Sequence, residues 1–296
     1  MFPVVPAPAR VTAGEGAFTL RAGDGVACSD AVLASVAATF VADLAAVGSL
    51  RLDVDAAPAA RGAITLALVD QIDEVSELAP TYGVSPVDAE PGSERYRLLV
   101  TADGITAEGV SQEAVFRALI SLRQLIEAAS SGADEVELAA VEIIDAPRYA
   151  WRGVSLDVAR SFLPIDYLEK HIDRMALFKL NRLHLHLTDD EAWRIHVEGY
   201  PEIAEVAAWR GHDLPIPPLL GSSHAPYGGA YSKQEIDRLS SHAESLGVVL
   251  VPEVDVPGVA APGERRDLLR VAAGSTASGG LLDAPATQNL GALWFC

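Results

Sequence analysis

Charged and polar residues follow three short apolar runs in this sequence, at the point where each run ends. They occupy residues 157–160, 188–191 and 253–258. Carboxylates, an imidazole and a guanidinium that meet at one place can transfer protons or bind the hydroxyl groups of a ligand. Packing alone does not account for three such groups in succession, so the sequence predicts a functional site.

The second of these runs has the clearest pattern. In residues 183–188 leucine alternates with histidine or threonine, which is the period of two that a strand imposes. In a closed barrel His184, His186 and Thr188 would then face the lumen. A core histidine satisfied by hydrogen bonds is the alternative for each histidine, and a solvated loop that caps the next helix is the alternative for residues 189–191. Adjacent carboxylates also repel each other and separate their pKa values, which is one way to obtain an acid and a base.

Strands and helices alternate in the second half of the chain. We expect strands over 152–157, 182–187 and 248–251, and helices over 165–178 and 232–247. Strand, helix and strand in this order indicate parallel βαβ units. In a (β/α)₈ barrel the active site lies at the carboxyl ends of the strands, which is where the charged residues stand.

The first half of the chain predicts a small α+β domain with helices packed on one face of a sheet. Pro147 interrupts helix and strand alike and marks the domain boundary. The elements expected before it are helices over 31–47 and 111–126, and strands over 63–69, 95–100, 105–108 and 136–144.

Composition excludes several classes of partner. A formal net charge of −19 argues against nucleic acid and anionic membranes, which select for basic patches. No apolar run is long enough to span a bilayer. Cys28 and Cys296 form neither a disulfide framework nor a cysteine zinc site. The first residues lack a secretory signal, so we expect a cytoplasmic protein by default, or a secreted one if the natural start is missing.

Several long motifs, in the right order, resemble the family-20 glycoside hydrolases, which are β-N-acetylhexosaminidases. Residues 151–164 (WRGVSLDVARSFLP), 179–190 (KLNRLHLHLTDD) and 251–258 (VPEVDVPG) look like the first three barrel strands of that family. Residues 227–232 (YGGAYS) are similar to the stretch before its second barrel helix, and residues 114–125 to its preceding small domain.

The resemblance implies an α+β N-terminal domain followed by an incomplete (β/α)₈ TIM barrel that contains the first three βα units. The domain is expected over 1–146 and the partial barrel over 150–260, with an irregular tail over 261–296. A complete barrel needs roughly 250 residues, whereas 146 follow residue 150. The open edge of such a sheet predicts self-association.

The resemblance also implies an activity. These enzymes remove terminal, non-reducing β-linked GlcNAc or GalNAc with retention, and the acetamido oxygen of the substrate is the nucleophile. No cofactor or metal is implied, and the partner would be an amino-sugar glycan or a chitooligosaccharide. In the family an Asp-Glu pair after the fourth strand supplies the general acid. No such pair follows Ala261 here, so we expect impaired hydrolysis.

Four residues match the supporting part of the family site. Arg160 corresponds to the arginine that binds sugar hydroxyls, and Asp189 to an aspartate in the relay that tunes the acid. His186 and Asp255 fall at polar positions in the same pocket, His186 as a substrate-binding residue and Asp255 as a second member of the catalytic relay. Val259 stands where the family has a relay histidine. The remaining charged residues of the motifs are expected to form ion pairs and caps; these are Arg152, Asp157, Asp190 and Glu253.

Two other functions remain open. A metal-dependent barrel hydrolase is suggested by His184 and His186, because imidazole is a common zinc ligand. The other histidines lie in predicted helices or loops, so a third ligand has no support. The second alternative is a non-catalytic sugar-binding remnant, or the product of a disrupted gene.

Overall fold

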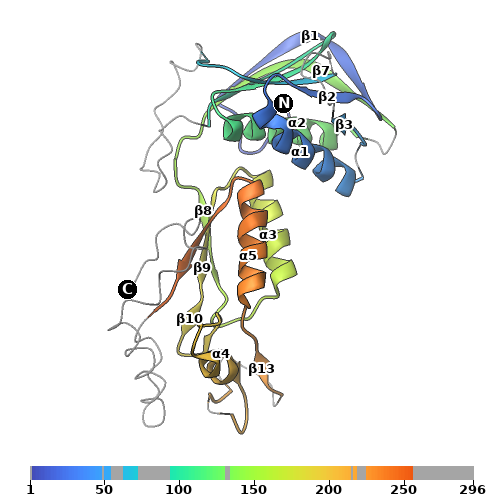
Figure 1. The fold of residues 1–296 in the computed structure, drawn as a ribbon. Helices are drawn as coiled ribbons and strands as arrows, with labels where there is room; N and C mark the ends of the chain where they lie inside the picture. The colour runs from blue at the N-terminus through green and yellow to red at the C-terminus, as the bar shows by residue number, and fades with distance from the viewer. Residues whose placement is uncertain are drawn as a thin grey trace. The chain divides into compact units, whose positions relative to one another are not determined.

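The computed structural model describes residues 2–48, 50–54, 63–72, 94–130, 134–214, 216–218 and 225–255. They belong to two compact units, Met1–Arg152 with Ala176–Lys179, and Gly153–Met175 with the residues from Leu180 onward (Figure 1). The predicted tail, Val259 and Cys296 lie outside the described residues. No helix within the described part of the chain is long and apolar enough to cross a membrane.

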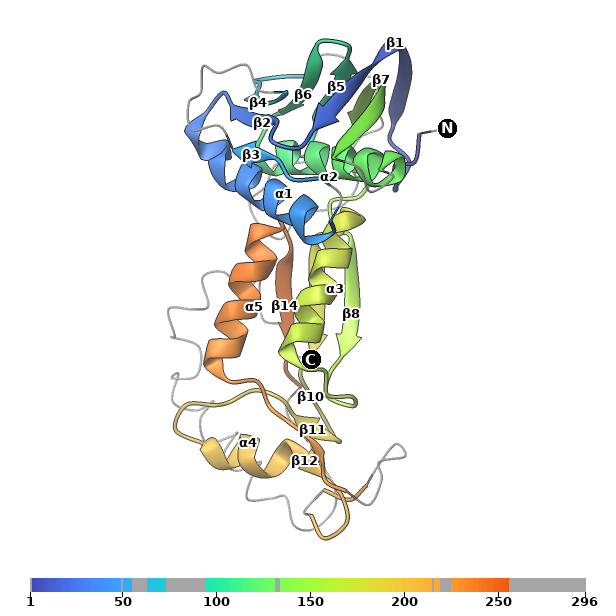
Figure 2. The same ribbon diagram turned by 90° about the vertical axis from the view of Figure 1, so that its right-hand side faces the viewer.

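The first unit contains a seven-stranded mixed sheet in the order β1-β7-β5-β6-β4-β2-β3. Helices α1 and α2 lie on one face of it (Figures 1 and 2). The strands are β1 (Arg10–Arg21), β2 (Gly25–Cys28), β3 (Asp53–Val54), β4 (Ile64–Leu68), β5 (Tyr96–Thr101), β6 (Gly104–Gly109) and β7 (Glu135–Asp145), and the helices are η1 (Ala31–Leu33), α1 (Ala34–Ala46) and α2 (Gln112–Ala129).

Helix α2 forms the centre of this unit's core. Ser111 is its N-cap, as predicted, and the hydroxyl oxygen accepts a hydrogen bond from the Ala114 N–H at 3.1 Å. Val115 and Leu119, from the predicted apolar stripe, are fully buried. Strand β1 was not predicted, because its residues are mostly exposed and show no alternation. It is held instead by antiparallel pairing with β7.

The second unit contains a three-stranded sheet in the order β14-β9-β8, and its strands are parallel, as the sequence predicts. The strands are β8 (Gly153–Asp157), β9 (Arg182–His186) and β14 (Val249–Glu253), and the helices α3 (Ile165–Leu177) and α5 (Lys233–Ser245) cover the same face (Figures 1 and 2). The capping box of α5 is present, since Ser232 and Glu235 bond each other's backbone N–H groups.

Strand β14 extends two residues beyond its predicted end at Val251. The next residue is a proline, which cannot donate a hydrogen bond to a neighbouring strand. Pro252 nevertheless lies inside β14, opposite Leu185 of β9. Among the described strands β14 has β9 as its one neighbour, and proline is tolerated in such an edge strand.

The segment between β9 and α5 forms small elements that the sequence did not predict. They are β10 (Thr188–Asp189), β11 (Ala192–Trp193), α4 (Pro201–Ala207), β12 (Trp209–Arg210) and β13 (Tyr227–Gly228). Strands β10 and β11 pair as a hairpin, with Asp189 opposite Ala192. Residues 189–191 therefore shape a hairpin, and the helix-capping loop considered as an alternative is wrong.

Candidate active site

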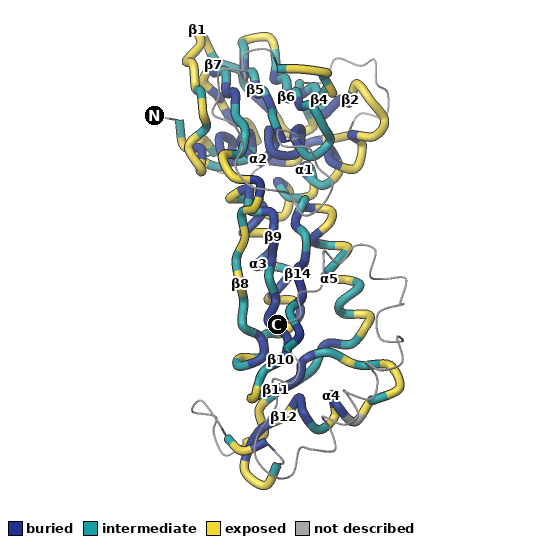
Figure 3. The backbone as a smooth tube through the Cα atoms, turned by 90° about the vertical axis from the view of Figure 1, so that its left-hand side faces the viewer, coloured by how far each residue is buried: buried dark blue, intermediate teal, exposed yellow. Residues whose placement is uncertain are grey.

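The carboxyl ends of the three parallel strands lie level with one another. Asp157 at the end of β8 and Glu253 at the end of β14 both stand opposite His186 of β9 in the ladder. Figure 3 shows β9 buried along most of its length, whereas β8 is largely exposed or half-buried. This register brings carboxylates from two strands to the imidazole on the strand between them.

Arg160 lies within a group of three carboxylates. Its Nη1 atom donates to Asp157 Oδ2 at 2.7 Å, its Nη2 atom pairs with Asp189, and its Nε atom lies 3.4 Å from Glu191 Oε2. The bond to Asp157 and the surrounding negative charges raise the pKa of Arg160. The side chain is still 43% exposed, so the guanidinium is held in place and open to a ligand.

His186 connects this group to β14. Its Nε2 atom lies 2.7 Å from Asp189 Oδ2, and its Nδ1 atom lies 3.2 Å from Glu253 Oε2. Burial opposes the charge on this imidazole, but the bond to Asp189 and the charges of Glu253 and Asp157 outweigh it and raise the pKa of His186. His186 thus lies between two carboxylates that favour its charged form, and Asp189 is shared by the imidazole and the guanidinium of Arg160.

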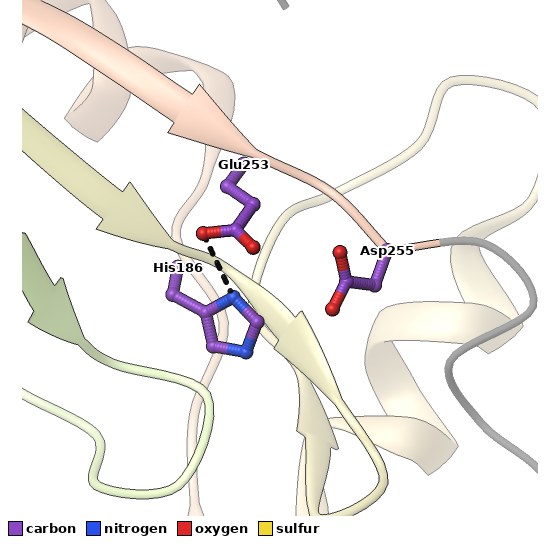
Figure 4. Close-up of side chains that lie close together, drawn as sticks. All are labelled: His186, Glu253 and Asp255. Atoms are coloured by element: carbon purple, nitrogen blue, oxygen red, sulfur yellow. Dashed lines mark ion pairs between the residues drawn. The ribbon is translucent and has the colours of Figure 1, made fainter. Parts of the chain in front are cut away.

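Asp255 lies beside His186 at the same strand end. Its backbone N–H donates to the hydroxyl oxygen of the fully buried Thr188 at 2.8 Å. Its Oδ1 atom is buried, and no hydrogen-bond partner for it lies within the described part of the chain. Figure 4 shows the carboxylates of Asp255 and Glu253 close to the His186 ring, with the ion pair between Glu253 and His186 as a dashed line.

His186, Glu253 and Asp255 could supply three ligands to a metal ion. One ligand atom from each lies within 4.8 Å of the others, and imidazole with two carboxylates is a donor set that zinc accepts. A metal requires a neutral imidazole, so the proton that the neighbouring carboxylates stabilise on His186 competes with it. His184 contacts the same Glu253, at 2.5 Å.

The structure thus brings Arg160, Asp189 and His186 into direct contact and places Asp255 next to His186. The sequence treated Glu191 only as part of a loop and missed its pairing with Arg160, because a two-residue hairpin has no pattern long enough to detect. Arg152 forms an ion pair with Glu94 at 2.5 Å in the first unit, which agrees with its predicted structural role.

Two family models match the chain. The model described as "Glycosyl hydrolase family 20, domain 2" matches residues 1–146, and "Glycosyl hydrolase family 20, catalytic domain" matches residues 149–267. The chain is similar to a beta-hexosaminidase from Akkermansia muciniphila, at 37% identity over 166 residues, which are 56% of this chain and 32% of that protein. It is also similar to a beta-N-acetylhexosaminidase from Cellulomonas fimi, at 36% identity over 58% of this chain and 32% of that protein.

Solved structures of family-20 enzymes are also similar to this chain. The GH20 exo beta-N-acetylglucosaminidase from Vibrio harveyi, in complex with N-acetylglucosamine, aligns with a TM-score of 0.73 and 29% identity over 86% of this chain and 36% of that one. A mutant Streptomyces plicatus beta-hexosaminidase in complex with its product GlcNAc aligns with a TM-score of 0.66 and 30% identity. The alignment covers 87% of this chain and 47% of that one. The chain spans about a third of the length of the curated relatives named above.

Proposed function

Since the chain belongs to glycoside hydrolase family 20, we propose that it is part of a β-N-acetylhexosaminidase that removes terminal, non-reducing β-linked GlcNAc or GalNAc. In this proposal residues 1–146 are the α+β domain that precedes the catalytic barrel, and residues 150–260 are the first three βα units of that barrel. The parallel order of β8, β9 and β14 and the alignment with complete family members support it.

The observation that carries the proposal is the Arg160 cluster. A planar guanidinium offers five fixed donors and can bond two adjacent sugar hydroxyls at once. Asp157 and Asp189 fix the orientation of this one, while its side chain remains 43% exposed. A terminal sugar held in this way would have its glycosidic bond directed away from Arg160, as exo cleavage requires.

We propose further that these 296 residues supply the sugar-binding part of the site and not the general acid. Substrate-assisted hydrolysis needs an acid for the leaving oxygen and a carboxylate that orients the acetamido group. After Ala261 the acidic residues are Glu264, Asp267 and Asp283, none of them in an Asp-Glu pair, and Val259 replaces the relay histidine. A positioned general acid contributes about 10²–10⁴ in rate, so the chain by itself should bind sugar without appreciable turnover.

Binding and turnover by the 296-residue chain test the two parts of the proposal separately. Titration calorimetry with N-acetylglucosamine and with glucose should give tighter binding of the 2-acetamido sugar. Arg160→Ala should raise the dissociation constant roughly 10-fold to 100-fold, because a charged donor to the sugar is lost. Release of the aryl group from an aryl N-acetyl-β-glucosaminide should stay at background.

The matched control is Arg238→Ala. Arg238 on α5 also binds two carboxylates, Asp166 and Glu169 of α3, and its side chain is 51% exposed, but it lies on the helical face. This variant should leave the dissociation constant unchanged. Equal effects of the two variants would contradict a role for Arg160 in sugar binding. Steady aryl release that Asp189→Asn or Asp255→Asn abolishes would contradict the missing acid.

The exposed strand β8 supports one further part of the proposal, which is self-association of the chain. Its residues are exposed or half-buried, and within the described residues it pairs with β9 on one side. An open strand edge can pair with another chain. Sedimentation analysis across a range of concentrations should show oligomers, and a monomer at every concentration would contradict this.

A further inference from the structure

Arg194, directly after β11, is fully buried and bonds carbonyl oxygens of the backbone. Its Nε atom donates to Val158 O at 2.8 Å and its Nη2 atom to Ala159 O at 2.7 Å. Its Nη1 atom donates to Ala208 O at 2.7 Å and to Gly229 O at 3.0 Å. None of the ion pairs found between described residues includes this guanidinium, so four dipoles rather than a carboxylate compensate its charge.

A buried cation of this kind is costly, which suggests that it has a specific task. Burial and the nearby charge of Arg210 lower the pKa of Arg194 to about 10. The side chain therefore remains charged at neutral pH. A guanidinium is suited to the task because its planar fork can reach several carbonyl groups, whereas a lysine ammonium has three donors on one nitrogen.

Two of the four acceptors belong to the residues immediately before Arg160. The N–H groups of Val158 and Ala159 both donate to His186 O, at 3.2 and 3.1 Å, while their carbonyl groups accept from Arg194. The Arg160 N–H donates to Asp157 Oδ1 at 2.9 Å, and Arg160 O accepts from Arg210 Nη1 at 2.8 Å. Every backbone polar group of residues 158–160 thus has a partner, which leaves this turn little freedom.

The chain just beyond Arg160 is held by an aromatic pair. The Phe162 ring lies 5.5 Å from the Arg194 guanidinium carbon and stacks on Tyr231 with ring centroids 5.2 Å apart. The Tyr231 hydroxyl donates to Leu163 O at 2.7 Å. Gly229 is needed here, because a Cβ atom at that position would lie 2.7 Å from the Phe162 ring.

We propose that Arg194 is a positioning residue, which fixes the backbone on which Arg160 stands and so aligns the exposed guanidinium before a ligand arrives. Arg210 and Tyr231 lie in the same segment between β9 and α5. They hold the backbone on either side of Phe162 through their bonds to Arg160 O and Leu163 O. The inference rests on the proposed function only for the identity of the ligand, an amino sugar. The alignment of Arg160 is a property of the free protein.

Two variants of the 296-residue chain test this role. Arg194→Met removes all four bonds and keeps an apolar chain of similar length, and Arg194→Lys keeps the charge. The order of the Arg160 side chain is followed by the ¹⁵N relaxation of its Nε–H group, and sugar binding by the dissociation constant for N-acetylglucosamine. Arg194→Met should make the Arg160 Nε–H group mobile and raise the dissociation constant roughly 10-fold or more. Arg194→Lys should have smaller effects than Arg194→Met on the mobility of the Arg160 Nε–H group and on the dissociation constant.

The control is Arg182→Met. Arg182 is also buried and donates to a backbone carbonyl, Asn181 O at 2.7 Å, but it begins β9 at the end opposite to the site. It should lower the melting temperature without changing Arg160 relaxation or sugar affinity. A general loss of stability would affect both variants alike, whereas a positioning role affects only the Arg194 variants.

Each outcome decides the question. If folded Arg194→Met keeps an ordered Arg160 Nε–H group and the wild-type affinity, the inference is wrong. If wild-type chain binds no sugar, the proposed function fails, and Arg160 relaxation alone still decides the positioning role. If Arg194→Met does not fold, Arg210→Lys replaces it, because that variant weakens the bond to Arg160 O and leaves the four bonds of Arg194 in place. If the relaxation of the Arg160 Nε–H group is unchanged both in that variant and in Arg194→Lys, the inference is likewise wrong.

Discussion

Arg117 in the first unit and Arg160 in the second are both held by carboxylates, but their surroundings differ. Arg117 bonds Glu94 at 2.8 Å and Glu113 at 2.7 Å, and its side chain is 2% exposed. Arg160 bonds Asp157 and Asp189 and is 43% exposed. The same pairing chemistry closes one guanidinium off from water and presents the other to it. Burial, and not the number of partners, distinguishes a structural arginine from one that can bind a ligand.

The buried cluster extends beyond Arg117. Glu94 also accepts a bond from Arg152 at 2.5 Å. Burial opposes the charge on Glu94, but the two guanidinium groups outweigh it and lower its pKa. Nearby in the same unit, Lys179 bonds Asp145 at 3.1 Å. Removal of one member would leave a charge in the interior with fewer partners, and loss of a partner from a buried pair is costly.

The largest effect on stability should therefore come from Arg117→Met. We expect the free energy of unfolding of the first unit to fall by about 3–5 kcal/mol, because Glu94 would lose a buried partner. Hydrogen exchange of the α2 amides measures it in the intact chain. Arg97→Met is the control, since Arg97 pairs with Glu142 on the sheet but is 37% exposed. A loss below about 1 kcal/mol for Arg117→Met, as expected for surface pairs, would remove the contrast.

Asp189→Asn should have the next largest effect. Asp189 pairs with both Arg160 and His186, and its side chain is 15% exposed. Loss of these charged bonds should cost about 1.5–3 kcal/mol, measured by urea unfolding. Asp237→Asn, which affects only an exposed pair with Lys233, should change little. If both variants lower the free energy of unfolding equally, the Asp189 pairs behave like those of a solvated surface.

The pH dependence of stability should be smaller and should come from His186. Its pKa is raised above 6.5 in the folded protein, so its contribution is fully present below about pH 6.5. The contribution is lost as the pH rises through the higher folded value. Melting temperatures between pH 6 and 8.5 should therefore fall more steeply for wild type than for His186→Gln. Parallel curves would mean that the imidazole is not held as a cation.

Arg160→Ala should have the smallest effect on stability and the largest on ligand binding. Its own side chain is 43% exposed, so we expect a change within about 1 kcal/mol, measured by urea unfolding beside the binding titration. This reverses the order expected for Arg117→Met, which should destabilise the first unit without changing the affinity of the folded protein for sugar. If Arg160→Ala is strongly destabilised, the Arg160 cluster has a structural role as well.

The grouping of Arg160, Asp189 and His186 could be predicted because one rule applies to all of them. Parallel strands end at a common edge, and the alternation over residues 183–188 fixed the position of that edge. Helices were predicted where caps and apolar stripes agree, as at Ser111 and in the capping box before α5.

Other features have no counterpart in the sequence pattern. Strand β1 is exposed and lacks alternation, so only its pairing with β7 reveals it. The hairpin of β10 and β11 has strands of two residues, which is too short for a period to appear. The partners of Arg194 are carbonyl oxygens, and any residue type could supply them.

The charges at the carboxyl ends of the three parallel strands also affect which ligands can bind. Four carboxylates, those of Asp157, Asp189, Glu191 and Glu253, face the basic side chains of Arg160 and His186. The negative excess should repel sugars that carry sulfate or uronic acid groups and leave uncharged ones unaffected. Above the pKa of His186 the excess grows by one charge, so discrimination against anionic sugars should sharpen in alkaline solution and weaken as salt is added.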